Sequence, residues 1–141
     1  MEQKLEVKHL ATYLPYGIKV TSPKWERDYR LHYDSHILNA VTIFDVISTP
    51  EAKLKLRPLL HITKEIEYKG KKFIPFIELS ETYKKDLNFD DHDPKKIVNQ
   101  SIILMKQYGY GHCQTWVFEK LCEWHFDVFG LIDKGLAVPL T

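Results

Sequence analysis

The densest cluster of potential metal ligands in this sequence is Asp90-Asp91-His92-Asp93. Carboxylate oxygens of this kind are ligands that Mg²⁺ and Ca²⁺ accept. Adjacent side chains point in different directions, however, and the spacing is not that of an EF-hand loop. Asp93 also precedes Pro94, and an aspartate N-cap followed by proline at the first helical position is a strong helix start. The capping interpretation is therefore preferred to a metal-dependent enzyme built on these residues.

A second set of candidate ligands comprises Cys122 and His125, which lie three residues apart in an apolar stretch. On a helix the two side chains share a face and could meet one metal ion. Two ligands fall short of the three or four that protein zinc sites use. Cys113 would lie about 13 Å from Cys122 along a continuous helix, which excludes it from the same site. A histidine there could also be a general base, but a core histidine bonded to a carbonyl or carboxylate is the simpler interpretation.

The best basic cluster is a predicted hairpin over residues 68–73, with Gly70 in its turn and three lysines at Lys69, Lys71 and Lys72. Basic side chains beside aromatic rings are able to bind single-stranded nucleic acid. Lysines on a two-stranded ribbon more often keep an exposed edge soluble and unpaired. Both interpretations stay open, and the second is favoured.

Residues 50–57 have two readings. Thr49 followed by Pro50 is typical of a helix start, whereas Lys53-Leu54-Lys55-Leu56-Arg57 alternates like a strand. If the segment is a strand, its three basic side chains, which are Lys53, Lys55 and Arg57, form a strip on one side.

Residues 29–34 alternate in the same way, with apolar side chains at 29, 31 and 33. The intervening Arg30, His32 and Asp34 are a candidate triad for chemistry. A solvated strand face explains the same pattern more simply.

Three aromatic side chains, Trp25, Tyr29 and Trp116, are candidate anchors for a partner. Trp116 falls near the polar arc of the helix expected there. It must therefore be covered by another segment or left at an interface.

The elements that would position these residues follow from periodicity and from Gly and Pro. Helices are expected at 5–14, 59–66, 94–108 and 116–129, with a further helical turn at 131–137. Strands are expected at 18–21, 29–34 and 37–48, and a loop is expected at 86–93. Residues 116–129 have a wide apolar arc and should form a central helix ended by Gly130. The sequence predicts one α+β domain over 1–141, with a small antiparallel sheet in the N-terminal half packed on a helical C-terminal half.

Composition narrows the class of protein. The chain has 141 residues, is 44% hydrophobic and 13% aromatic, and carries 20 Lys+Arg against 19 Asp+Glu. This balance argues against a strong phosphate-binding surface. Glu119, Glu123 and Asp127 would likewise repel DNA from the central helix. No stretch predicts a membrane span or signal peptide, and two cysteines without a framework favour a reducing compartment, so a cytoplasmic protein is expected.

Five stretches carry a resemblance to a known group of proteins. They are LPYGIKV at 14–20, LRPL at 56–59, TKEI at 63–66, the hairpin around Gly70 followed by Phe73, and EWHFDVFGLIDKGLA at 123–137. In these stretches the chain resembles small uncharacterised proteins encoded by phages and prophages of Bacteroidetes-type bacteria. The resemblance implies a phage-derived, cytoplasmic protein and carries over no catalytic residue.

The functional hypothesis is a non-enzymatic accessory protein that acts through protein–protein contacts, either with another protein or with a second copy. No set of nucleophile, base and oxyanion donors converges in the sequence, and no cofactor or membrane partner is expected. The alternatives are a nucleic-acid-binding protein that uses the lysine hairpin and a metal-dependent enzyme.

Overall fold

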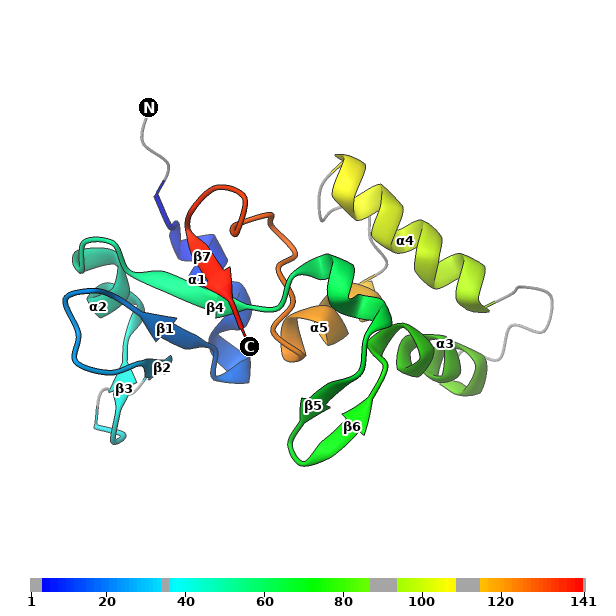
Figure 1. Cartoon of the computed structure of the whole chain (residues 1–141), viewed down its shortest axis with the longest axis horizontal. Coiled ribbons are helices and arrows are strands. Elements are labelled where there is room, and N and C mark those ends of the chain that lie inside the picture. Colours follow the sequence, from blue (N-terminus) through cyan, green and yellow to red (C-terminus); the bar gives the residue numbers. More distant parts are fainter. Residues whose placement is uncertain (1–3, 34–35, 87–93, 109–114, 141) are drawn as a thin grey trace. The chain divides into compact units, whose positions relative to one another are not determined.

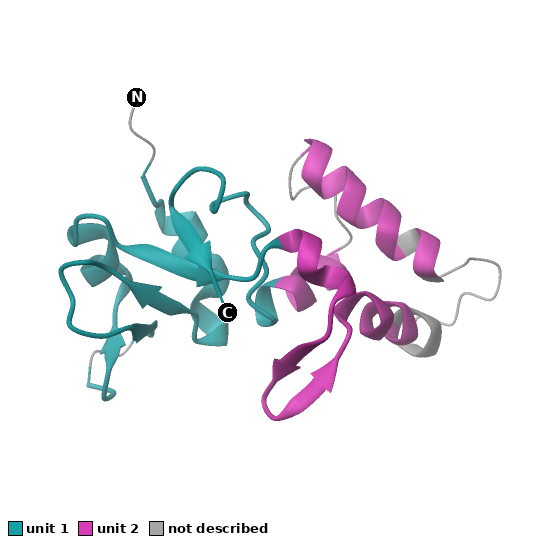
Figure 2. Cartoon of the chain, in the orientation of Figure 1, with its two compact units in different colours: residues 1–58, 122–141 teal, residues 59–121 magenta. Residues whose placement is uncertain are grey.

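The chain has an α+β fold, as the sequence predicts. A computed structural model describes residues 4–33, 36–86, 94–108 and 115–140 (Figure 1). Their contacts separate into two compact units (Figure 2). Unit 1 comprises residues 1–58 and 122–141, and unit 2 comprises residues 59–121. Unit 1 is therefore built from both ends of the chain, and unit 2 is inserted between them.

Unit 1 contains a five-stranded sheet in the order β3-β2-β1-β4-β7. The strands are β1 (Lys19–Thr21), β2 (Tyr29–Leu31), β3 (Ala40–Val41), β4 (Lys53–Leu56) and β7 (Ala137–Pro139). The central strand β1 is antiparallel to both of its neighbours, whereas β3 runs parallel to β2 and β7 runs parallel to β4. The sheet is thus mixed, because its two edge strands arrive through longer connections than a hairpin.

Alternation along the strands gives the sheet one buried and one accessible face. The buried face carries aliphatic side chains, which are Ile18, Val20, Leu31, Leu54 and Leu56. In β4 the burial alternates from residue to residue, so residues 53–56 form a strand and the competing helical interpretation is wrong. The accessible face includes the lysines of β1 and β4.

Most of residues 37–48 do not form the predicted strand. After the two residues of β3 the chain enters helix α2 (Ile43–Ser48). The Thr42 backbone N–H donates to the Asp45 carboxylate at 2.8 Å, and the Asp45 N–H donates back to the Thr42 hydroxyl at 3.3 Å. This reciprocal capping box satisfies two amides at the helix start and outweighs the strand preference of the β-branched residues.

The N-terminal helix is shorter than predicted. Helix α1 (Val7–Tyr13) is followed directly by a 3₁₀ turn, η1 (Leu14–Tyr16). Pro15 lies within this turn. The buried side chains of α1 are His9, Leu10 and Tyr13, whereas Val7 is exposed. The Tyr13 hydroxyl donates to the Phe126 carbonyl at 2.6 Å and accepts from the Val128 N–H at 3.2 Å. These two bonds satisfy the hydroxyl of Tyr13, whose side chain is fully buried.

Unit 2 contains the predicted hairpin and the longer helices. A 3₁₀ helix, η2 (Leu59–Thr63), replaces the helix expected at 59–66, because Ile66 already begins strand β5 (Ile66–Tyr68). Strand β6 (Lys71–Phe73) pairs with β5, and the turn residues Lys69 and Gly70 have φ of 51° and 78°. Positive φ at both positions is the geometry of a tight hairpin turn.

Three helices complete unit 2, and the last of them includes the first two residues of the following unit 1 segment. The three helices are α3 (Pro75–Asp86), α4 (Pro94–Tyr108) and α5 (Thr115–Glu123). Helix α4 has the predicted bounds and buries Val98, Ile102 and Met105, whereas Tyr108 at its end is exposed. Helix α3 was not predicted. In the described ranges no helix is long and apolar enough to cross a membrane.

The central helix ends at Glu123, well before Gly130. His125 adopts φ of 63°, and its N–H donates to the Cys122 carbonyl at 3.0 Å, which is how a left-handed residue closes a helix. The Arg57 N–H then donates to the His125 carbonyl at 2.7 Å, and the Asp127 N–H donates to the Arg57 carbonyl at 2.9 Å. Pairing with the end of β4 therefore replaces the predicted helical continuation.

The segment after Gly130 is also not the predicted helical turn. The Asp127 carboxylate accepts from the Leu131 N–H at 2.8 Å and from the Ile132 N–H at 2.9 Å. Turns follow, and residue 137 begins strand β7. Hydrogen bonds to one buried carboxylate thus direct the chain back to the sheet.

Candidate partner-binding surface

His125 is a buried structural residue. Its Nε2 lies 2.8 Å from the Tyr16 carbonyl, so this ring nitrogen carries the proton and donates it. The prediction of a core histidine bonded to a carbonyl is confirmed. The prediction that Cys122 and His125 share a helix face is wrong, because α5 ends between them.

The predicted oxygen-rich metal site lies outside the described residues. The structure does not describe Asp90, Asp91, His92 and Asp93, nor the separate range that contains Cys113. Within the described ranges, no three His, Cys, Asp or Glu side chains lie close enough together to hold a metal ion. The metal-site hypothesis for residues 90–93 therefore stays a prediction.

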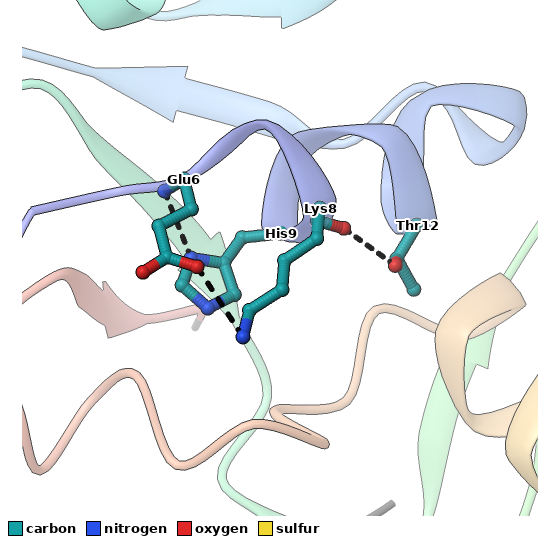
Figure 3. Close-up of polar contacts among 4 residues, drawn as sticks. All are labelled: Glu6, Lys8, His9 and Thr12. Carbon is teal, nitrogen blue, oxygen red and sulfur yellow. Dashed lines mark hydrogen bonds and ion pairs between the residues drawn. The ribbon is translucent and has the colours of Figure 1, made fainter.

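A second buried histidine, His9, was missed in the sequence. The Glu6 backbone N–H donates to His9 Nδ1 at 3.0 Å, and the Lys8 ammonium lies 3.3 Å from the Glu6 carboxylate (Figure 3). The imidazole also meets the Phe129 ring edge-on, with ring centroids 5.0 Å apart. Because Nδ1 accepts a hydrogen bond, the ring must be neutral, with its proton on Nε2.

The two buried histidines predict a loss of stability in mild acid. Burial lowers the pKa of His9 below its ordinary value of 6.5. Burial also lowers the pKa of His125, and the nearby Arg57 charge adds to the effect. The unfolded chain then binds more protons than the folded chain below pH 6.5, so the free energy of unfolding should fall as the pH drops through 6.5 and towards the lowered pKa values. Urea unfolding between pH 7.5 and 5 measures this slope.

Asparagine substitutions identify the responsible groups. An asparagine at position 9 can accept the Glu6 N–H without titrating, so His9→Asn should flatten the slope, and His125→Asn should flatten it further. His61→Asn, on η2 in unit 2, is the matched control. A slope that survives in the His9→Asn, His125→Asn double variant would contradict the assignment.

The lysine hairpin is present, but carboxylates offset part of its charge. Lys71 Nζ lies 3.2 Å from Glu78 Oε1, and Lys72 stands directly opposite Glu67 in the strand register. Lys69 lies over the Tyr68 ring, 5.4 Å from its centroid. The predicted nucleic-acid-binding role of Lys69, Lys71 and Lys72 remains a prediction.

The two candidate tryptophan anchors are half-buried. The Trp25 ring meets the Tyr29 ring edge-on, with centroids 5.4 Å apart and planes at 85°. Trp116 lies on the first turn of α5. Both indoles therefore present only part of their surface to a partner, and their predicted role stays untested.

The accessible face of the unit 1 sheet is basic. Lys19 pairs directly with Arg30 across β1 and β2, and continuing the β1–β4 register by one residue places Lys19 opposite Lys55. Asp28 forms an ion pair with Lys55. Lys53 adds a further cation, so strands β1, β2 and β4 bring four cations to this face. The sequence revealed only the β4 part of this surface.

Arg57 was predicted to extend the basic strip of β4. Its Nε instead donates to the Trp124 carbonyl at 2.9 Å, and its pKa is lowered by burial. The guanidinium is thus used inside unit 1 to hold the segment that follows α5.

One end of the basic face forms a recess of about 410 Å³. It lies among β1, β2 and the turn before β3, and its lining includes Lys19, Arg30 and His32. Arg30 Nη1 donates to the Gly17 carbonyl at 3.0 Å, which orients the guanidinium. Of the triad considered above, Arg30 and His32 therefore reach one recess, and Asp34 lies outside the described residues.

Large apolar side chains are exposed in the lining of this recess, at Ile37 and Leu38, and at neighbouring positions in the sequence. Ten are exposed in the described residues, and half of them come from residues 33–47: Tyr33, Ile37, Leu38, Phe44 and Ile47. Leu38 is 87% exposed, Tyr33 78% and Phe44 76%. We call these five side chains the apolar segment. The strand predicted over residues 37–48 does not indicate this exposure.

Comparison of the chain with protein-family models, with curated proteins and with solved structures finds no match.

Proposed function

We propose that this chain is a small, non-enzymatic accessory protein of phage origin, which acts in the cytoplasm by binding another protein through the apolar segment. The observation that carries the proposal is the concentration of exposed apolar side chains in residues 33–47. Scattered exposed apolar residues are ordinary, but a concentration of them is typical of an interaction site. The resemblance to phage and prophage proteins supports the origin and the compartment.

Local structure supports a contact role for α2. Phe44 and Ile47 are three residues apart, so they lie on the same side of this helix. Val46 is buried and fixes the opposite side to unit 1. The capping box between Thr42 and Asp45 fixes the start of the helix, so the two apolar side chains are held in place before a partner binds, which lowers the entropic cost of binding.

Site-specific cross-linking tests the proposal. A photoreactive phenylalanine derivative at position 44, in full-length protein expressed in phage-infected cells, should capture one protein species. The Leu38→Ser, Phe44→Ser double variant should bind that species at least about tenfold more weakly, because truncating a central contact residue costs about 2 kcal/mol or more. Binding of the purified species is measured by calorimetry.

The control is the Ile77→Ser, Ile103→Ser double variant, which removes two exposed apolar side chains from unit 2. It should bind like the parent chain. Equal loss in both variants, or no specific product from position 44, would refute the assignment of this surface.

Nucleic-acid binding through Lys69, Lys71 and Lys72 is the second proposal, and it has less support. Glu67 and Glu78 lie beside two of the three lysines and would repel phosphate. A metal-dependent enzyme at residues 90–93 has no further support from the described residues.

A further inference from the structure

We infer that the recess beside the apolar segment binds an acidic stretch of the protein partner, with a carboxylate against Lys19 and Arg30 and a large apolar side chain against Ile37 and Leu38. The inference rests on the proposed partner-binding function and specifies the chemistry of the partner. It assigns a binding role to the paired cations of β1 and β2.

The first argument for a carboxylate ligand is that Lys19 and Arg30 carry like charges. The two residues are direct partners across β1 and β2, which brings their side chains to the same face a few ångströms apart. Like charges in this position destabilise a sheet. The carboxylate in the recess lining is Asp28, and it forms an ion pair with Lys55. Asp28 also attracts Lys19, and a bound carboxylate would offset the positive charge that remains in the recess.

The second step is the orientation of Arg30. A guanidinium has five N–H donors in a rigid planar fork. The Gly17 carbonyl, at 3.0 Å from Nη1, is the acceptor that the described residues provide. This bond holds the plane of the group and leaves donors directed away from it. An oriented guanidinium of this kind suits a bidentate carboxylate.

The third step is the apolar wall. Ile37, Leu38 and Ala40 line the recess together with the cations. A volume of about 410 Å³ accommodates a carboxylate and one large side chain, and it lies in the range of about 300–1,000 Å³ that is typical of ligand pockets. Ile37 and Leu38 belong to the apolar segment, so the recess includes part of the surface proposed above.

These features favour a protein ligand over a nucleic acid. A phosphate backbone is recognised mainly by positive charge, so an apolar wall would contribute little to its binding. An acidic peptide with an aliphatic or aromatic side chain complements both the charge and the wall. We therefore commit to an acidic protein segment as the occupant.

The test uses two synthetic peptides with blocked ends. One is acetyl-Asp-Glu-Leu-Phe-Glu-amide, and the other is its uncharged counterpart, acetyl-Asn-Gln-Leu-Phe-Gln-amide. Each is titrated into the ¹⁵N-labelled full chain, and the amide shifts of Gly17, Lys19, Arg30 and Ala40 are followed. The acidic peptide should shift these amides in a saturable way, and the uncharged peptide should bind at least tenfold more weakly.

Variants of the chain complete the test. Arg30→Gln and Lys19→Gln should each weaken the acidic peptide at least fivefold, and Lys19→Gln does so without removing the bond to Gly17. Lys24→Gln, at an exposed position outside the recess lining, should leave binding unchanged. Equal binding of the two peptides would overturn the inference, as would parent-like binding by both recess variants. Tighter binding of a single-stranded oligonucleotide at the same amides, with no peptide binding, would also overturn it.

The result is separable from the cross-linking test. If position 44 captures a partner and the peptides do not bind, only the recess assignment fails. If the acidic peptide binds and position 44 captures nothing, the proposed use of the apolar segment fails and the recess keeps its ligand.

Discussion

Phe126→Ala is expected to lower the free energy of unfolding by about 3–5 kcal/mol, which is the usual cost of deleting a buried phenylalanine side chain. The Phe126 side chain is fully buried in unit 1. Its backbone bridges to Arg57, and its carbonyl accepts the Tyr13 hydroxyl at 2.6 Å. Alanine would therefore leave a cavity at the point where the N-terminal helix, the end of β4 and the C-terminal segment meet. Urea unfolding followed by the fluorescence of the neighbouring, buried Trp124 measures the loss.

Phe44→Ala is the matched control for this prediction. It deletes the same side chain at an exposed position, and surface substitutions of that kind change stability by within about 0.5 kcal/mol. If Phe126→Ala lowered the free energy of unfolding by less than about 1.5 kcal/mol, the surrounding residues would have to fill the cavity. That result would contradict a central position for Phe126 in the core.

The second large effect is expected for Asp127→Ala, at about 2–4 kcal/mol. The carboxylate is buried and accepts from the N–H groups of Leu131 and Ile132 at 2.8 and 2.9 Å. Alanine would leave both amides without this acceptor, and bonds to a charged acceptor are worth more than neutral ones. The same urea unfolding experiment applies, with hydrogen exchange of the two amides as a local readout.

Asp127→Asn separates the two bonds. Its single amide oxygen can keep one of the amides bonded, so its loss should be about half that of Asp127→Ala. Faster exchange of both amides in Asp127→Ala, and of one amide in Asp127→Asn, would agree with the geometry. Unchanged exchange in Asp127→Ala would show that the carboxylate does not hold this turn.

The elements that the sequence predicted well are those with local determinants. The hairpin depends on a two-residue turn, and α4 depends on a proline start and a regular apolar side. The predictions failed where long-range pairing decides the structure. The apolar arc of residues 116–129 favours a continuous helix, but the backbone of Arg57 takes the hydrogen bonds of His125 and Asp127. No pattern within the C-terminal stretch contains that information.

The candidate site was hidden for a related reason. Lys19 and Arg30 are eleven positions apart, and only the register of β1 against β2 makes them neighbours. Exposure of Leu38 and Phe44 runs against their hydrophobic character, so hydrophobicity alone does not predict it. The Thr42–Asp45 capping box is a local signal for a helix start, and it argues against the strand predicted at 37–48.

The pairing of β4 with β7 also constrains the order in which the chain can fold. Leu54 pairs with Ala137, and the whole of unit 2 lies between them in sequence. During synthesis, residues 59–121 leave the ribosome before β7 does, so unit 2 is free to fold while β4 still lacks this neighbour. Contacts that close such long loops form slowly, because the chain loses conformational entropy before the stabilising contacts are made. The sheet that carries the basic face is therefore completed late, after the inserted unit has been made.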